Sequence, residues 1–179
     1  MASTQRPSTA NGTSGTRKVA HALGQPIAEP SDGRGERRSL ERLVDEAAEQ
    51  ITRFSAPEAF SACAVDGVII DIRSPDAREL YGVIPRSMHI PRTVLEWRIA
   101  LDSPWRNRHL GGRDQQLILI CDHGYSSILA ASNLVQLGFS RAGDVIGGFE
   151  SWKDNGLPIA PCRQRLSTVG ALPGTGPPE

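Results

Sequence analysis

The sequence predicts a single α/β domain of three layers, a parallel sheet covered by helices, between about residues 39 and 160. Three observations predict it. The apolar runs Val68–Ile72 and Leu117–Cys121 are continuous, which is typical of strands buried on both faces of a parallel sheet. Helical patterns alternate with these runs. The flanking segments 1–38 and 161–179 are rich in Gly, Pro, Ser and Thr and are predicted to be disordered tails, which leaves one core.

The first half of the domain begins with an amphipathic helix. Apolar side chains recur at intervals of three and four residues from Leu40 to Ile51, which predicts a leading helix over about 39–50. Ser55-Ala56-Pro57-Glu58 has the form of a capping box and introduces a short helix. The elements predicted next are the strand Val68–Ile72, a helix over Pro75–Leu80 that starts from Ser74, extended chain around Met88–Ile90, and a helical turn over Leu95–Ile99.

The second half holds the strand that ends at Cys121, after a polar loop near Trp105–Arg113. A helix is predicted from about Ser126 to Leu137, with the hydroxyls of Ser126 and Ser127 at its cap and Gly138 as its stop. Its buried side is predicted to be Ile128, Leu129, Leu134 and Val135. The last elements are the strand Asp144–Ile146, a tight turn at Gly147–Gly148, and a helix over Phe149–Asn155.

Composition excludes several classes of function. The 20 acidic and 20 basic side chains balance, so no global field attracts nucleic acid or an anionic membrane. No segment has the eighteen or so consecutive apolar residues of a membrane span, and the start of the chain lacks the apolar core of a secretory signal, so we expect a cytoplasmic protein. Cys63, Cys121 and Cys162 form no Cys-x-x-Cys pair and are expected to be reduced thiols. Cys121 and His123 alone are weak support for zinc, and no metal is expected.

The loop after Cys121 is the best candidate for chemistry. A thiol between a strand and a helix meets converging backbone N–H groups and the positive end of the helix dipole, and both favour the thiolate. A thiolate is the nucleophilic form of cysteine at neutral pH. The alternative is a buried cysteine that only fills space. The loop favours the nucleophile, because a packing cysteine does not need Gly124 or the neighbouring hydroxyls of Ser126 and Ser127.

Four blocks in order and spacing resemble a single-domain rhodanese, over roughly Ile51 to Ile159. They are Val68-Ile69-Ile70-Asp71-Ile72-Arg73; Gly82-Val83-Ile84-Pro85 with His89-Ile90-Pro91; the Cys121 loop; and Ile146-Gly147-Gly148-Phe149 with Trp152 and Gly156-Leu157-Pro158. The resemblance implies a rhodanese-like domain over 39–160 with a five-stranded parallel sheet flanked by helices. It also implies an active cysteine at the carboxyl edge of a central strand, where ligands bind in open α/β sheets.

The resemblance implies a sulfurtransferase without a cofactor. Cys121 would take the sulfane sulfur of a donor, a persulfide or thiosulfate, and pass it as a persulfide to a thiol or to cyanide. The loop formed by Asp122, His123, Gly124, Tyr125, Ser126 and Ser127 would cradle the thiolate and the persulfide with its amides. A non-catalytic binding or regulatory module is the other class of function that such domains serve, although these versions commonly lose the cysteine.

Loop length distinguishes sulfur transfer from phosphatase chemistry in this fold. Related phosphatases have arginine at the sixth position after the cysteine, because a phosphate dianion needs a wider cradle and a bidentate guanidinium. Here that position is Ser127, and 122–127 contain no arginine. The loop also departs from the commonest rhodanese pattern, which often carries basic residues. Because Asp122 opposes a dianion, we expect weak activity with thiosulfate and a preference for a persulfide donor.

Residues outside the loop are expected to support it. Asp71 and Arg73 match the Asp-x-Arg strand end of the family, and we expect a structural ion pair that supports the loop. Arg92 is a candidate source of the missing positive charge, as are Arg78 and Arg98. His123 is close enough in sequence to influence Cys121, and Tyr125 is expected at the pocket mouth. Cys162 is expected to be inert, with a role as an acceptor thiol as the open alternative, and Cys63 is expected to pack beneath the sheet.

Overall fold

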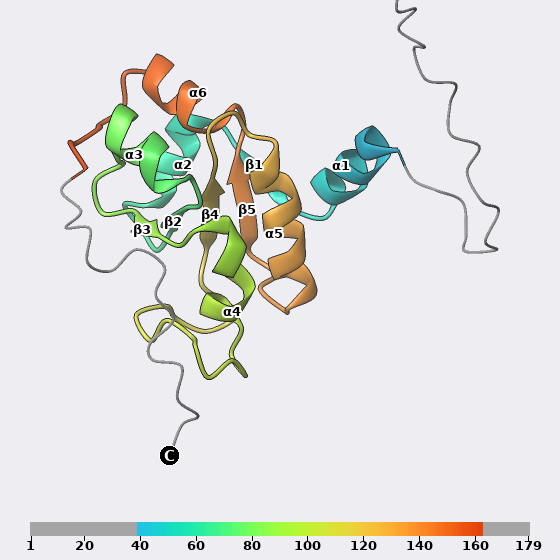
Figure 1. Ribbon diagram of the computed structural model, residues 1–179. Coiled ribbons are helices and arrows are strands. Elements are labelled where there is room, and N and C mark those ends of the chain that lie inside the picture. Colours follow the sequence, from blue (N-terminus) through green and yellow to red (C-terminus); the bar gives the residue numbers. More distant parts are fainter. Residues whose placement is uncertain (1–38, 163–179) are drawn as a thin grey trace, which may run out of the picture. The chain divides into compact units, whose positions relative to one another are not determined.

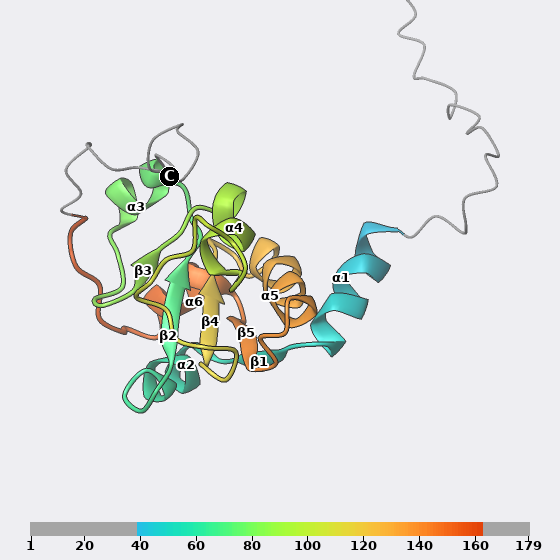
Figure 2. The same cartoon turned by 90° about the horizontal axis from the view of Figure 1, so that it is seen from below.

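The computed structural model describes residues 39–162, and the tails predicted for 1–38 and 163–179 lie outside the described residues. These residues form a five-stranded, fully parallel sheet with the strand order β1-β5-β4-β2-β3 (Figures 1 and 2). The strands are β1 (Thr52–Phe54), β2 (Val68–Asp71), β3 (Met88–His89), β4 (Leu117–Ile120) and β5 (Ala142–Val145). The predicted α/β class and the five-stranded parallel sheet are confirmed.

Helices flank the sheet on both faces. They are α1 (Leu40–Glu49), α2 (Ala56–Ala62), α3 (Pro75–Tyr81), α4 (Leu95–Ile99) with the 3₁₀ turn η1 (Arg92–Val94) before it, α5 (Ser126–Gln136) and α6 (Gly148–Asp154). One apolar cluster joins the sheet to α4 and α5, and a second joins it to α2 and α6. The central strand β4 separates these clusters, and all four of its side chains are fully buried. The predicted three layers are therefore present.

Local rules account for the starts of two short helices. Ser55 caps α2 through a complete capping box: its Oγ accepts from the backbone N–H of Glu58, and the Glu58 carboxylate accepts from the backbone N–H of Ser55. Ser74 caps α3 by a single side-chain bond, in which its Oγ accepts from the backbone N–H of Ala77 at 3.1 Å. Both caps are confirmed as predicted.

Register brings three functional strand ends to one edge of the sheet. Asp71 in β2 pairs with Ile120 in β4, and Leu119 pairs with Asp144 in β5. Because parallel strands end at a common edge, the side chains that follow or close these strands meet there. Cys121 comes one residue after β4, so this edge is where the thiol lies.

The structure corrects the elements at three places. β1 was not predicted, because three residues with polar side chains at two positions give no apolar run. β5 begins at Ala142, two residues before the predicted strand. It includes Gly143, where a Cβ would clash with the carbonyl oxygen of Thr52 in β1. On α5, Ile128 and Leu134 are buried as predicted, but Leu129 and Val135 are only half-buried, and the small residues Ala130 and Ala131 are buried in their place.

No helix between residues 39 and 162 has the length and apolar character needed to cross a membrane.

Candidate active site

Cys121 lies at the carboxyl end of β4 with 6% of its surface exposed. Its Sγ accepts a hydrogen bond from the backbone N–H of Gly124 at 3.1 Å, and it lies 3.3 Å from the Oγ of Ser127. The loop therefore turns back over the sulfur. An N–H donor and a hydroxyl near one thiol stabilise negative charge on it.

These donors set the pKa of the thiol. Burial alone raises the pKa of Cys121, because it disfavours the charged form. Hydrogen bonds from the hydroxyls of Ser127 and Ser126 and from the amides of Ser127 and Gly124 together outweigh burial, so the pKa of Cys121 is held below its ordinary value. A lowered pKa increases the thiolate fraction at neutral pH, and the thiolate is the reactive form.

The two serine hydroxyls do not cap α5, contrary to prediction. The N-cap residue is Tyr125, which makes no side-chain capping bond, and the two serines are the first residues of the helix. Sequence rules assign such hydroxyls to caps because the helix N–H groups are the nearest donors along the chain. Here the sulfur competes for them, since both hydroxyls act on Cys121.

A buried polar chain extends from the sulfur across the sheet edge. Ser127 Oγ donates to Oδ2 of Asp144 at 3.2 Å, and both residues are fully buried. Asp144 in turn accepts from Nε of Arg53 at 2.9 Å and from Nη2 at 3.3 Å. These hydrogen bonds hold the Ser127 hydroxyl beside Sγ. In the thiol form, Cys121 donates to Ser127 and Ser127 donates to Asp144; in the thiolate form, the single Ser127 proton turns to the sulfur and Asp144 keeps its bonds from Arg53.

Glycines in the next turn allow the loop to approach the helix after β5. A Cβ on Gly148, which has φ +61°, would lie 2.5 Å from the carbonyl oxygen of Cys121. A Cβ on Gly124 would lie 2.7 Å from the backbone nitrogen of Gly147. The N–H of Phe149 donates to the carbonyl oxygen of Cys121 at 2.8 Å. The cysteine loop and the Gly147–Gly148 turn are thus one packed unit, and side chains at these positions would separate them.

The side chains of His123 and Tyr125 lie on the exposed side of the loop. Nδ1 of His123 lies 3.1 Å from a carboxylate oxygen of Glu150, and both side chains are more than half exposed. Tyr125 is 72% exposed, and Asp122 is half-buried. Cys121 therefore takes its hydrogen bonds from the inner side of the loop, while His123 is engaged by Glu150.

A buried ion cluster closes the end of β2. Asp71 accepts from the backbone N–H and Nε of Arg73, and its Oδ2 accepts from Nη2 of Arg73 at 2.8 Å and from Nη1 of Arg78 at 2.5 Å. Arg73 also donates to the carbonyl oxygen of Gly82 and lies 3.5 Å above the ring of Phe149. The cluster ties the β2 end to α3 and to α6, the helix that packs on the cysteine loop.

Two of the arginines that could supply positive charge to the loop are engaged elsewhere. Arg92 of η1 forms a part-buried ion pair with Glu96 of α4 at 2.9 Å. Arg98 donates to the carbonyl oxygen of Trp105. Arg78 joins the buried cluster, which has two guanidinium groups for one carboxylate. Arg73 Nη1 and Arg78 Nε, both buried, have no hydrogen-bond partner among residues 39–162.

The sequence analysis did not predict the roles that four residues have around Cys121: Arg53, Asp144, Gly147 and Gly148. The two consecutive glycines before a helix could have indicated a close approach of two backbones. A charged residue in a predicted strand, such as Asp144, was a weaker indication of a buried contact. Nothing in the sequence around Arg53 indicated its role. Within 39–162, no three His, Cys, Asp or Glu side chains are grouped so that they could hold a metal ion.

The structure is that of an open α/β domain with a five-stranded parallel sheet of order β1-β5-β4-β2-β3 and a cysteine loop at the carboxyl end of its central strand. Residues 56–155 match the family model described as Rhodanese-like domain, and the chain belongs to this family.

Curated relatives place the chain among sulfurtransferases. It is 38% identical over 98 residues to thiosulfate sulfurtransferase GlpE of Pseudomonas syringae pv. syringae, a match that covers 54% of this chain and 83% of the relative. It is 34% identical over 104 residues to the protein of the same name from Pseudomonas entomophila, with 58% and 86% covered. The chain is therefore a rhodanese-type sulfurtransferase, which acts on small sulfur donors and thiol acceptors.

A solved structure from Rhodopseudomonas palustris, a protein of unknown function described as a possible tyrosine phosphatase, is similar in fold and sequence. Its TM-score is 0.65 at 31% identity, with 76% of this chain and 100% of that chain covered. The polysulfide-sulfur transferase homodimer of Wolinella succinogenes has a TM-score of 0.56 at 22% identity, with 69% and 88% covered, and supports the fold alone.

Proposed function

We propose that Cys121 carries the transferred sulfur as a persulfide. The thiolate attacks the outer sulfur of thiosulfate, the S–S bond of the donor breaks, and sulfite leaves with the bonding electron pair. A low-molecular-weight persulfide reacts in the same way and releases its thiol. In the second step cyanide or an acceptor thiol attacks the outer sulfur of the enzyme persulfide. Thiocyanate or a new persulfide leaves, and the Cys121 thiolate returns.

The observation that carries this proposal is the inner shell of donors around Sγ. The Gly124 amide and the Ser127 hydroxyl lie within 3.3 Å of the sulfur, at the open edge of the sheet. They stabilise the attacking thiolate, and the other loop amides remain available for the anionic outer sulfur of the persulfide. Asp71 and Arg73 support this loop through α6 and do not touch the sulfur, while Arg92 has no proposed contact with the donor.

Phosphatase chemistry is not supported by the same loop. A phosphate dianion needs a guanidinium in the cradle, and residues 122–127 contain none. The relatives named as thiosulfate sulfurtransferases favour sulfur transfer as well.

The donor preference follows from charge near the mouth. The half-buried Asp122 follows the cysteine directly and opposes a dianionic donor, whereas the names of the relatives favour thiosulfate. We propose that both donors load Cys121 and that a persulfide does so faster. Initial rates with thiosulfate and with glutathione persulfide, at matched concentrations, test this. A faster rate with thiosulfate would contradict it.

The charge balance and the free cysteines also suggest a cellular location and a class of partner. The three cysteines are free, which suits a reducing cytoplasm, and equal numbers of acidic and basic side chains give no field for nucleic acid or a membrane surface. We propose a cytoplasmic enzyme whose partners are small molecules.

Intact-protein mass spectrometry after brief exposure to each donor tests the sulfur carrier. The wild type should gain one sulfur, and Cys121→Ser should gain none. Cys63→Ser is the matched control, because it removes a half-buried thiol elsewhere in the domain and should load like the wild type. Absence of a gain with both donors would favour a non-catalytic binding module.

A further inference from the structure

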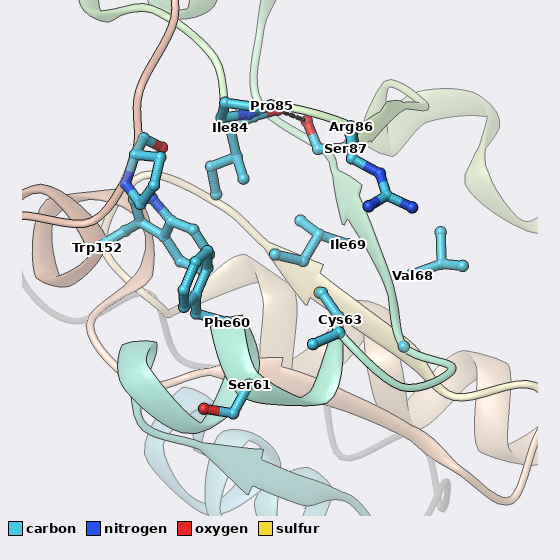
Figure 3. A pocket seen from close by; sticks show the side chains of 13 residues that line it. Phe60, Ser61, Cys63, Val68, Ile69, Ile84, Pro85, Arg86, Ser87 and Trp152 are labelled. Carbon is cyan, nitrogen blue, oxygen red and sulfur yellow. Dashed lines mark hydrogen bonds between the residues drawn. The ribbon is translucent and has the colours of Figure 1, made fainter.

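A pocket lies on the face of the sheet that α2 and α6 cover. Its volume is about 570 Å³. Figure 3 shows its walls: the end of α2, the start of β2, the turn at Ile84–Ser87, and Trp152 of α6. The lining side chains that the argument uses are Phe60, Cys63, Ile69, Ile84, Arg86 and Trp152. A volume of this size is in the range of small-molecule sites.

This pocket is separate from the cysteine loop. Its lining includes no residue of 121–127. It reaches Val68 at the start of β2, which pairs with Leu117 at the start of β4, four residues before Cys121. At about 3.3 Å per residue the two levels are roughly 13 Å apart along the strands. The pocket therefore opens toward the amino edge of the sheet, opposite to the edge that holds the thiol.

The walls are mainly apolar and aromatic. Ile69 and Ile84 are buried, and Trp152 is fully buried against the edge of Phe60, with 5.9 Å between the ring centroids. Phe60 itself is 45% exposed, so the apolar lining continues to the surface. Binding is favourable when the apolar part of a ligand displaces water from an open apolar hollow.

One cation stands over this apolar hollow. Arg86 is the only non-glycine residue of 39–162 with positive φ, at 66°. Its turn is closed by Ser87, whose N–H and Oγ both bond the carbonyl oxygen of Ile84. Figure 3 shows the guanidinium extending from this turn toward the side of the pocket where Ile69 lies. Among the described residues Arg86 has no hydrogen bond or ion pair.

The thiol of Cys63 forms part of the pocket wall. Burial raises the pKa of Cys63, although the charge of Arg86 acts in the opposite direction, so the thiol is neutral at pH 7. A neutral thiol behaves as a small apolar group. The charge in the pocket is therefore the positive charge of Arg86.

We propose that this pocket is a binding site for a small amphipathic organic anion, with its apolar body between Phe60, Ile69 and Trp152 and its carboxylate or sulfonate at Arg86. The apolar walls fix the body of the ligand and the single unpaired cation fixes its charge. The site is independent of sulfur loading at Cys121.

Titration of the full chain with octanoate and with its uncharged amide, octanamide, tests the proposal through backbone amide chemical shifts. Octanoate should shift residues of the pocket, above all around Cys63 and Ile84, and leave 122–127 unchanged. It should bind about tenfold more tightly than octanamide, because a hydrogen-bonded charge is lost in the amide.

Three variants complete the test. Arg86→Gln should remove the preference for octanoate, and Ala64→Phe, which adds a ring at the pocket wall, should weaken both ligands. Cys121→Ser should bind octanoate like the wild type. The proposal is overturned if octanoate shifts the cysteine loop instead, if octanamide binds equally well, or if neither ligand gives a saturable shift at millimolar concentration.

Discussion

Replacing Asp71 by Asn should destabilise the domain by about 3 kcal/mol. The carboxylate is fully buried and, within residues 39–162, is the only ion-pair partner of two guanidinium groups whose side chains are 0% and 6% exposed. Removing one partner of a buried pair costs about 3 to 5 kcal/mol, because the other charge stays buried without compensation. Asn keeps one acceptor oxygen for Arg73, so we expect the lower end. The midpoint of thermal unfolding should fall by roughly 10 °C.

Urea unfolding of Asp71→Asn beside Asp66→Asn gives a matched comparison. Asp66 pairs with Arg141 at 2.8 Å, but both side chains are almost half exposed, so the same substitution there should cost less than about 1 kcal/mol. Adding Arg78→Met to Asp71→Asn should restore part of the loss, since one stranded charge is removed. If Asp71→Asn costs no more than Asp66→Asn, the reasoning about the buried cluster is refuted.

Three further predictions concern the loop and pH. Ser127→Ala should raise the pKa of Cys121, so the pH profile of iodoacetamide alkylation should move to higher pH. An unchanged profile would show that the Ser127 hydroxyl does not lower the pKa of the thiol. Gly148→Ala should lower sulfur loading at least tenfold, whereas Gly156→Ala, with nearly the same φ but open space around the added Cβ, should load normally. Burial lowers the pKa of His89 below the ordinary histidine value of about 6.5, so the folded state disfavours its protonated form. That contribution to stability is complete above pH 6.5 and is lost as pH falls below it, so unfolding midpoints at pH 5 and pH 8 should differ less in His89→Gln than in the wild type.

The fold was predictable where the sequence carries long apolar runs and local caps. β2 and β4 are continuous apolar strands, and Ser55 and Ser74 cap helices through bonds to residues three positions away. β1 was not predictable in this way, because Thr52–Phe54 forms a strand only through its pairing with β5, which lies about ninety residues further along the chain.

The candidate site was likewise predictable only in part. The loop around Cys121 is contiguous, so its residue types indicated a thiolate site directly. The partners of Ser127 come from other strands, and a polar residue such as Asp144 has no local pattern that reveals its contacts. The pocket beside α2 and α6 could not be predicted for the same reason, since its walls come from four separate segments.

The pairing of the first strand with the last one has a consequence for synthesis on the ribosome. Arg53 is made early, but its register partner Asp144 and the glycines behind the cysteine loop are made about ninety residues later. Until β5 inserts between β1 and β4, the Cys121 loop lacks the Gly147–Gly148 turn that packs against it and the Asp144 carboxylate that holds Ser127 in place. The donors around Sγ therefore reach their positions, and the pKa of Cys121 falls, only when the finished domain closes.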